Sequence, residues 1–199
     1  MVDDQRGLAA AKYFIEKKID DILATGDADA GLDGFLTLST GASGVFIENK
    51  SGDLAGDWDV STTAASAILD DFGIMMANFE QYGLFVPDTC ILDTNSWTRM
   101  IRLQINATST TTVIEFLSEK YGLTFDRWHK VNLADSAGTG PRVVLYQKSD
   151  DVVSPIISVE PEILPSVWKG TLWETVLHAR CGGVRVENPK GILYADHHV

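Results

Sequence analysis

A long amphipathic helix at the start of the sequence constrains the fold more than any other feature. Apolar residues recur there at spacings of three and four, which aligns them on one helix face over residues 5–25. Gly26 follows the last of them, where a left-handed cap commonly ends a helix. About 20 residues at 1.5 Å rise make a rod of roughly 30 Å, which is long for a domain of this size. The aligned residues are Leu8, Ala11, Ile15, Ile19 and Ile22.

The middle of the chain predicts mixed helix and strand. Seven of the chain's 17 glycines fall between residues 26 and 56, which indicates turns and short strands. A second helix is expected from an N-cap at Ser61 or Thr62 to a stop at Gly83. Its core stripe is Ile68, Phe72, Met75, Phe79 and Tyr82, and Asp70, Asp71 and Glu80 are expected to face solvent. Further helices are expected at 96–103 and 111–121, and strands at 89–92, 128–133, 143–147 and 152–159.

The C-terminal segment alternates apolar and polar residues from 172 to 186. The two glycines Gly182 and Gly183 have the form of a two-residue hairpin loop, so we expect a hairpin that turns there. In that register His178 faces Glu187, and Trp173 lies on the apolar face as a core residue. A final strand is expected at 192–195.

Composition and charge exclude several classes of protein. The chain has 199 residues, 45% of them apolar and 22% charged, which is ordinary globular composition. Its net charge of −12 argues against direct binding of nucleic acid, which depends on Lys and Arg releasing counterions. No apolar run approaches the ~20 residues of a membrane span, and the acidic residues 1–4 do not open a secretory signal. Cys90 and Cys181 are expected to be free thiols in a reducing cytoplasm.

The sequence shows no catalytic constellation, and we expect no catalytic, cofactor-binding or metal-ligating residues. A calcium loop is the best metal candidate, because Asp27 and Asp29 fit its first two ligand positions. Its third position holds Gly31 and its bidentate position holds Leu38, so a helix-to-turn connection is favoured. The acidic cluster at 53–59 is interpreted as a solvated loop.

Three ordered landmarks resemble the tailed-phage and prophage major capsid proteins with the Hong Kong phage-type fold, which encapsulins share. The first is KIDDIL at 18–23 with GDA at 26–28 and GLDGFL at 31–36, similar to the family's spine helix and its following turn. The second is VPDTCIL at 86–92 with Ser96 and Trp97. The third is HARCGGVRV at 178–186, followed by Pro189 and YAD at 194–196.

This resemblance implies an α+β fold of two domains. A peripheral domain would comprise residues 1–59 and 160–199, with the spine helix at 5–25 and the C-terminal β hairpin. An inserted α/β axial domain would comprise residues 60–159. The family's N-terminal arm and extended loop have no counterpart here, so the chain looks truncated at its N-terminus.

The resemblance also implies a structural role rather than an enzymatic one. The expected partners are copies of the chain, forming hexameric or pentameric capsomers around packaged DNA, in the virion and, during assembly, in the host cytoplasm. Two alternatives are an encapsulin-like compartment shell and a small α/β ligand-binding domain or enzyme. The residues that we expect at subunit contacts are Trp168, Lys169, Asp27, Asp29 and Phe35.

Overall fold

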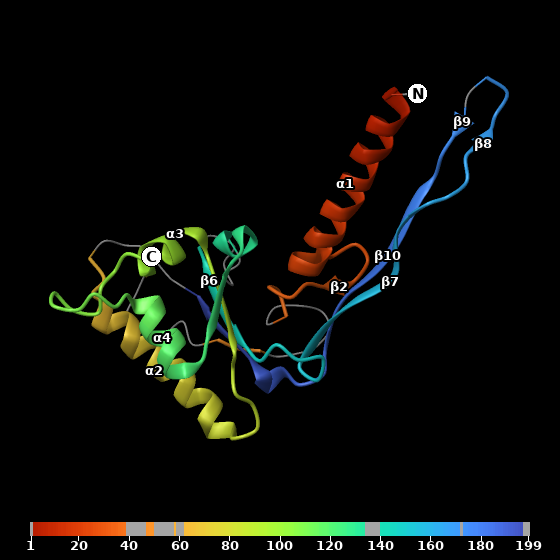
Figure 1. Cartoon of the computed structure of the whole chain (residues 1–199). Coiled ribbons are helices and arrows are strands. Elements are labelled where there is room, and N and C mark those ends of the chain that lie inside the picture. Colours follow the sequence, from red (N-terminus) through yellow and green to blue (C-terminus); the bar gives the residue numbers. More distant parts are fainter. Residues whose placement is uncertain are drawn as a thin grey trace. The chain divides into compact units, whose positions relative to one another are not determined.

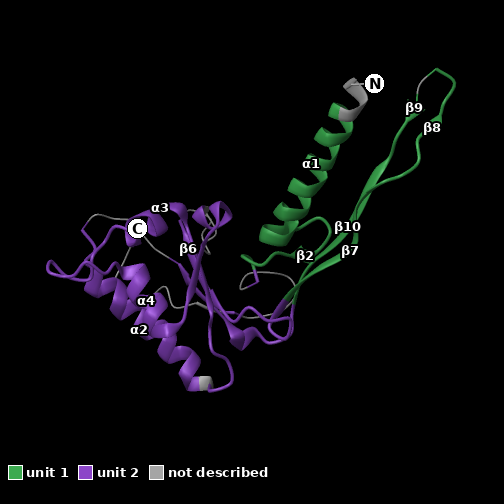
Figure 2. Ribbon diagram, viewed as in Figure 1, with its two compact units in different colours: residues 1–37, 154–185 green, residues 38–153, 186–199 purple. Residues whose placement is uncertain are grey.

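The computed structural model describes residues 2–38, 47–49, 58, 62–133, 140–171 and 173–196. The chain divides into two compact units, and each unit is built from two stretches of sequence (Figures 1 and 2). Unit 1 comprises Met1–Thr37 and Ser154–Arg185. Unit 2 comprises Leu38–Val153 and Val186–Val199. The fold is of the mixed α+β class, as predicted.

Helix α1 (Val2–Thr25) confirms the predicted long helix and begins unit 1. The helix ends at Gly26, whose φ of 82° is the left-handed conformation that glycine adopts most readily. Strands β1 (Gly26–Asp27) and β2 (Leu32–Asp33) then pair antiparallel. The chain folds back onto the helix end, because Phe35 N–H donates to Leu23 O and Leu36 N–H donates to Ala24 O, both at 2.8 Å. Carbonyls that a helix end leaves unpaired are satisfied in this way.

A long two-stranded ribbon forms the rest of unit 1 (blue in Figure 1). Strand β7 (Val153–Ile163) pairs with β10 (Leu177–Val186). Two short strands lie between them in the sequence, β8 (Val167–Trp168) and β9 (Trp173–Glu174), and these pair with each other. The ribbon turns between β8 and β9, so β7 and β8 form the arm before the turn, and β9 and β10 form the arm after it.

The predicted hairpin turn at Gly182 and Gly183 is wrong, because β10 runs through both residues as one strand. These two glycines do not form a turn; because they have no side chain, other segments of the same protein can approach the strand closely there. A Cβ on Gly183 would lie 3.0 Å from the Asp33 carbonyl oxygen, and one on Gly182 would lie 3.0 Å from Ile156 Cγ2. The hairpin therefore forms from β7 and β10.

A mixed five-stranded sheet is the centre of unit 2, in the order β3-β11-β6-β4-β5. The outer pairs β3–β11 and β4–β5 are parallel, and β6 is antiparallel to both β11 and β4. The last strand of the chain therefore lies inside the sheet rather than at its edge. The bounds are β3 (Glu48–Asn49), β4 (Thr89–Leu92), β5 (Thr124–Arg127), β6 (Arg142–Tyr146) and β11 (Ile192–Asp196).

Helices α2 (Ala65–Tyr82), α3 (Thr94–Met100) and α4 (Val113–Tyr121) complete unit 2, with short 3-10 helices at His129–Leu133 and Pro189–Gly191. Gly83 ends α2 in the left-handed conformation, as predicted, and Gly122 ends α4 in the same way. Four residues of the predicted α2 stripe, Ile68, Phe72, Met75 and Phe79, are buried together with Cys90 and Leu145 from the sheet. The Trp58 ring stacks on the Phe72 ring, with centroids 4.9 Å apart.

Four local predictions in unit 2 are corrected. Helix α2 begins at Ala65 rather than after a cap at Thr62, and Ser61 lies outside the described residues. Asp71 is 1% exposed, because the Trp58 indole N–H donates to its carboxylate at 2.7 Å. The strand predicted at 128–133 is a 3-10 helix. Helix α3 starts at Thr94, because the Asp93 side chain accepts two backbone N–H bonds as its N-cap.

Candidate assembly surfaces

The tip of the ribbon exposes two tryptophans. Trp168 and Trp173 lie opposite each other in β8 and β9, with ring centroids 5.3 Å apart. Their side chains are 51% and 66% exposed. The prediction that Trp173 is a core residue is therefore wrong, because β8 and β9 form a sheet of only two strands. Trp168, which we expect at a subunit contact, lies in β8.

An ion pair and a hydrogen bond between hydroxyl groups connect the two arms of this tip, and exposed apolar side chains lie near them. The Lys169 ammonium lies 2.5 Å from a Glu174 carboxylate oxygen, and the Ser166 and Thr175 hydroxyls are 2.6 Å apart. Large exposed apolar patches that are bordered by polar residues often mark sites of contact with other proteins. We define the ribbon-tip patch as Ile163, Leu164, Val167, Trp168, Trp173 and Val176, all of which are exposed.

His178 has a different partner from the one predicted. Its Nε2 lies 3.5 Å from a Glu162 carboxylate oxygen in β7, whereas the sequence register paired it with Glu187. The change follows from the ribbon, because β10 pairs with β7 and not with residues after Gly183.

Helix α1 exposes a second pair of aromatics, which the sequence analysis missed. Tyr13 and Phe14 are 60% and 65% exposed and contact each other edge to face at 5.8 Å. Both residues fall outside the apolar stripe of the helix. Two large aromatic residues on the polar side of a helix are a sequence feature that could have indicated an exposed contact site. Aromatic side chains are enriched at protein interfaces.

The turn after α1 contains the other residues expected at contacts. The Asp27 carboxylate accepts from Ala30 N–H at 3.3 Å and lies 3.3 Å from the Lys18 ammonium. The Ala30 bond and then Lys18 lower the pKa of Asp27. Asp29 is exposed, whereas Phe35 is buried. In the described segments no cluster of three or more His, Cys, Asp or Glu could hold a metal ion; the acidic residues at 53, 57 and 59 lie outside those segments.

A groove of about 550 Å³ separates the α1 helix from strand β10 within unit 1. Three isoleucines of the predicted stripe, Ile15, Ile19 and Ile22, line its helix side. Residues 177–181 of β10 line the opposite side, and Lys18 and Asp27 also line the groove. The isoleucines remain partly exposed, so the apolar face of α1 is incompletely covered.

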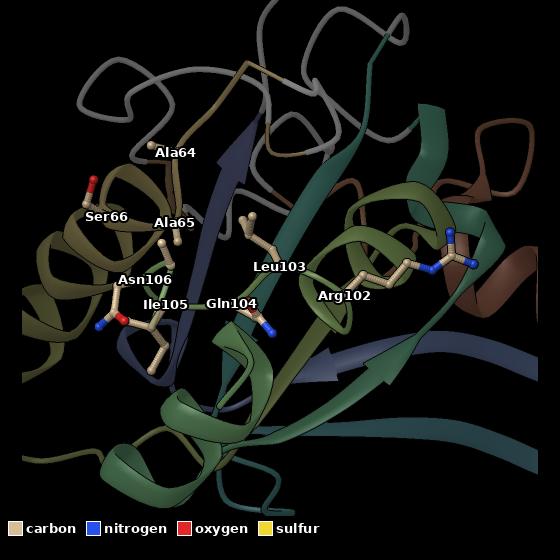
Figure 3. A pocket seen from close by; sticks show the side chains of 9 residues that line it. Ala64, Ala65, Ser66, Arg102, Leu103, Gln104, Ile105 and Asn106 are labelled. Carbon is tan, nitrogen blue, oxygen red and sulfur yellow. The ribbon is translucent and has the colours of Figure 1, made fainter. Parts of the chain in front are cut away.

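A second hollow, of about 450 Å³, lies in unit 2 at the start of α2 (Figure 3). Ala64, Ser66 and the segment from Arg102 to Ala107 line it. The Arg102 side chain extends away from Ala64 and Ser66, so it does not complete an anion site with the helix N-terminus (Figure 3). The lining offers no paired acid and base for catalysis.

Strongly buried ionisable groups in unit 2 have structural explanations. Arg142 and Asp196 are each 1% exposed and form a two-bond ion pair at 2.6 and 3.0 Å. The Arg142 guanidinium also lies 4.4 Å from the Tyr194 ring centre. Burial raises the pKa of both the Tyr194 phenol and the Cys90 thiol. The ion pair joins the first residue of β6 to the last residue of β11.

Comparison with solved structures identifies the fold. The capsid of Myoviridae phage XM1 superposes with a TM-score of 0.82 at 11% identity, over 98% of this chain and 65% of that one. The capsid of an empty GTA particle gives 0.62 at 10% identity, over 99% and 66%. A virus-like particle from Pyrococcus furiosus gives 0.57 at 12%, over 85% and 62%. The chain thus spans slightly less than two thirds of the length of these proteins.

A search of the curated proteins found none that matches this chain. In the described residues no helix is long and apolar enough to cross a membrane. The profile of the major capsid protein family matches residues 3–197, which is almost the whole chain. The description of the matched family, major capsid protein, points to a structural rather than an enzymatic role. The chain belongs to the major capsid protein family.

Proposed function

We propose that this protein is a structural subunit of a phage or prophage capsid, which self-associates into capsomers around packaged DNA. The match of the family profile over residues 3–197 carries the proposal. Its site of action would be the virion, with assembly in the host cytoplasm. Since the chain spans 65% of the XM1 capsid protein, the role of the whole protein is part of the proposal.

The exposed apolar residues of unit 1 support self-association. A tryptophan pair at the end of a ribbon resembles the aromatic anchors that dominate binding energy at interfaces. The ribbon-tip patch and the Tyr13–Phe14 pair lie on different elements of unit 1, the ribbon and α1, and each offers exposed apolar side chains to a neighbour. Such repeated contacts between identical chains are what a closed shell requires.

We keep the residues expected at contacts within this proposal. Trp168 and Lys169 belong to the ribbon tip, and Asp27 and Asp29 belong to the turn after α1. Phe35 is buried and would support that turn from within unit 1 rather than touch a neighbour. The peripheral domain (1–59 and 160–199) and axial domain (60–159) also remain a proposal. Unit 1 has two stretches like the peripheral domain, whereas unit 2 includes residues 186–199 and is therefore not one continuous insertion.

The net charge of −12 is consistent with enclosing DNA without gripping it. An acidic subunit repels phosphate, so the packaged DNA would be confined rather than bound by sequence. The same charge keeps free subunits apart until apolar contacts form, and that repulsion is screened by salt.

A compartment shell for protein cargo is the second candidate. The likeness to a virus-like particle from Pyrococcus furiosus favours it, at a TM-score of 0.57 against 0.82 for the XM1 capsid. The contents of purified particles separate the two candidates: nuclease-protected DNA supports the capsid, and a co-purifying protein with no DNA supports the compartment.

Light scattering and negative-stain microscopy of the purified chain test the proposal. We expect ring-shaped or shell-shaped particles whose mass is a multiple of 21.7 kDa, at concentrations in the micromolar range. Sedimentation in high and low salt would follow the electrostatic contribution. A monomer of 21.7 kDa under all these conditions would contradict the claim that this chain assembles.

A further inference from the structure

Helix α1 has two faces with different surroundings. Its stripe of isoleucines lines the groove beside β10. At about 100° per residue, the side opposite that stripe carries a second row of residues at spacings of three and four. We call this row the outer face of α1, and it consists of Arg6, Ala10, Tyr13, Phe14, Lys17 and Asp21. Asp21 is partly exposed, and the other residues of the face are exposed.

The charges of the outer face make one half of the helix complementary to the other half. Arg6 lies at one end of the face and Asp21 lies at the other, roughly 22 Å away along the helix. Two copies of the helix can lie antiparallel about a two-fold axis that passes between positions 13 and 14. Arg6 of each copy then lies opposite Asp21 of the other, so both ends of the pair bring opposite charges together.

The side chains in the middle of this arrangement also fit each other. Tyr13 and Phe14 contact each other edge to face at 5.8 Å, and in the antiparallel pair each lies opposite the other type of ring from the second copy. Ala10 lies opposite Lys17 of the second copy. Because alanine is small, it leaves room for the aliphatic stem of the lysine, whose ammonium can stay in water.

The ion pairs within a single chain set this face apart from the rest of α1. Lys12 and Lys18 lie off the outer face, and each pairs with an acidic residue of its own chain, at 3.6 and 3.3 Å. Arg6 and Lys17 lie on the outer face and have no such partner in the part of the chain that the structure describes. Residues 6–24 contain four basic and three acidic side chains, although the whole chain has a net charge of −12. The general repulsion between acidic copies is therefore weak at this helix.

We propose that the outer face of α1 binds the same face of a second copy as an antiparallel helix pair with two-fold symmetry. The proposal rests on the self-association proposed above and names the segment, residues 6–21, that each copy contributes. Two aromatic residues from each copy can bury roughly 600 Å² in total, which is less than the ~1,200 Å² of the smallest stable interfaces. The pairing therefore joins subunits that other contacts, such as the ribbon-tip patch, already hold together.

Cysteine cross-linking tests the register of the pair. Ala10→Cys and Lys17→Cys are introduced into separate chains that carry Cys181→Ser, and an equal mixture is associated and treated with a short bis-maleimide. Cys90 is fully buried and stays in place. We expect mixed 10–17 cross-links to exceed the half of the product that random collision gives, because identical positions lie roughly 10 Å further apart along the helix.

The matched control for this cross-link is Lys12→Cys mixed with Lys17→Cys. Lys12 is exposed on the same helix but lies off the outer face. We expect this mixture to give little cross-link, with the mixed product at its random share. Circular dichroism checks that all cysteine variants keep the helical content of the parent.

An exchange of charges tests the contact at the ends of the pair. Arg6→Glu or Asp21→Arg alone places like charges opposite each other at both ends, so each change should lower the yield of the 10–17 cross-link about fivefold. The variant with both changes restores opposite charges and should recover the yield. Lys12→Glu changes the net charge as Arg6→Glu does, but away from the outer face, and should leave the yield unchanged.

The outcomes distinguish this proposal from the proposed capsid function. Particles in which the 10–17 cross-link stays at its random share, or a double charge variant that recovers nothing, would overturn the helix pair and leave shell assembly standing. Small oligomers with the expected cross-link and charge rescue, but no particles, would support the helix pair and contradict the capsid role. Cross-links from position 10 or 17 to a different protein would assign the outer face to another partner and overturn the pair. A chain that stays monomeric and without cross-links would contradict both proposals.

Discussion

The two units of this protein bury their apolar residues to very different degrees. In unit 2 a five-stranded sheet and the helix α2 enclose side chains such as Phe72, Leu92 and Leu145, which are fully buried. In unit 1 the helix α1 and the ribbon leave Phe14, Trp173 and their neighbours more than half exposed. Unit 2 thus contains most of the buried apolar residues, whereas unit 1 exposes many of its large apolar side chains.

In the proposed shell subunit, this difference would assign folding to unit 2 and association to unit 1. Burial of apolar surface is worth about 25 cal/mol per Å², whether the covering group comes from the same chain or from another. A ribbon of two strands has no second layer of its own, so its stability depends on what it contacts. Unit 2 would then keep its fold in the free subunit, and unit 1 would gain order on association.

The largest stability effect is expected from the buried ion pair in unit 2. Arg142→Met leaves the Asp196 carboxylate buried without its cation, which should lower the free energy of unfolding by about 3–5 kcal/mol. The double variant Arg142→Met with Asp196→Leu should recover most of this loss. Urea unfolding followed by tryptophan fluorescence measures both. A single variant as stable as the parent would mean that unit 2 does not depend on this pair.

A smaller effect is expected at the tight turn of unit 1. A Cβ on Gly34 would lie 2.3 Å from Gly26 N and 2.5 Å from the Ala24 carbonyl, so Gly34→Ala should destabilise this turn by about 1–3 kcal/mol. Hydrogen exchange should show the loss in residues 20–37 and leave the sheet of unit 2 unchanged. Gly7→Ala is the control, since nothing lies within 4 Å of its added Cβ. Equal losses in both units would contradict their independence.

The smallest effect concerns pH and the cap of α4 in unit 2. Thr112 N–H donates to the Glu115 carboxylate at 2.8 Å, and this bond lowers the pKa of Glu115 below its ordinary value of 4.5. A lowered folded pKa gives stability that is present above pH 4.5 and is lost as the pH falls through the folded value. Glu115→Gln should therefore differ most from the parent at neutral pH, in thermal midpoints measured from pH 3 to 7. A difference that grows toward acid pH would contradict this assignment.

Sequence reasoning predicted the elements whose signals are local. The stripe Ile68, Phe72, Met75 and Phe79 specifies the buried face of α2, and Gly83 ends that helix as expected. These features depend on residues within a turn or two of each other. The long helix α1 follows from the same periodicity.

The errors concern contacts between distant residues. The alternation of apolar and polar residues over 177–186 predicts a strand but does not say which strand it pairs with. The interpretation of the two glycines as a hairpin turn is wrong, because the partner is β7 rather than the residues after Gly183. Asp71 follows the helix pattern of a solvent-facing residue, but Trp58, 13 residues earlier, brings it a buried hydrogen bond. Trp173 was expected in the core because large aromatics are mostly buried, and the sequence does not reveal that its sheet has only two strands.

Light scattering of two double variants tests the contrast between the units most directly. Trp168→Ser with Trp173→Ser removes the exposed aromatics of unit 1, and Leu84→Ser with Val86→Ser removes an apolar pair of unit 2 that is 75% and 72% exposed. Each change should alter the unfolding free energy by only about 0.5 kcal/mol, because the residues are at the surface. We predict that the tryptophan variant stays monomeric where the parent and the Leu84–Val86 variant associate. Association of the tryptophan variant at parental concentrations, with loss of association in the other, would contradict the account.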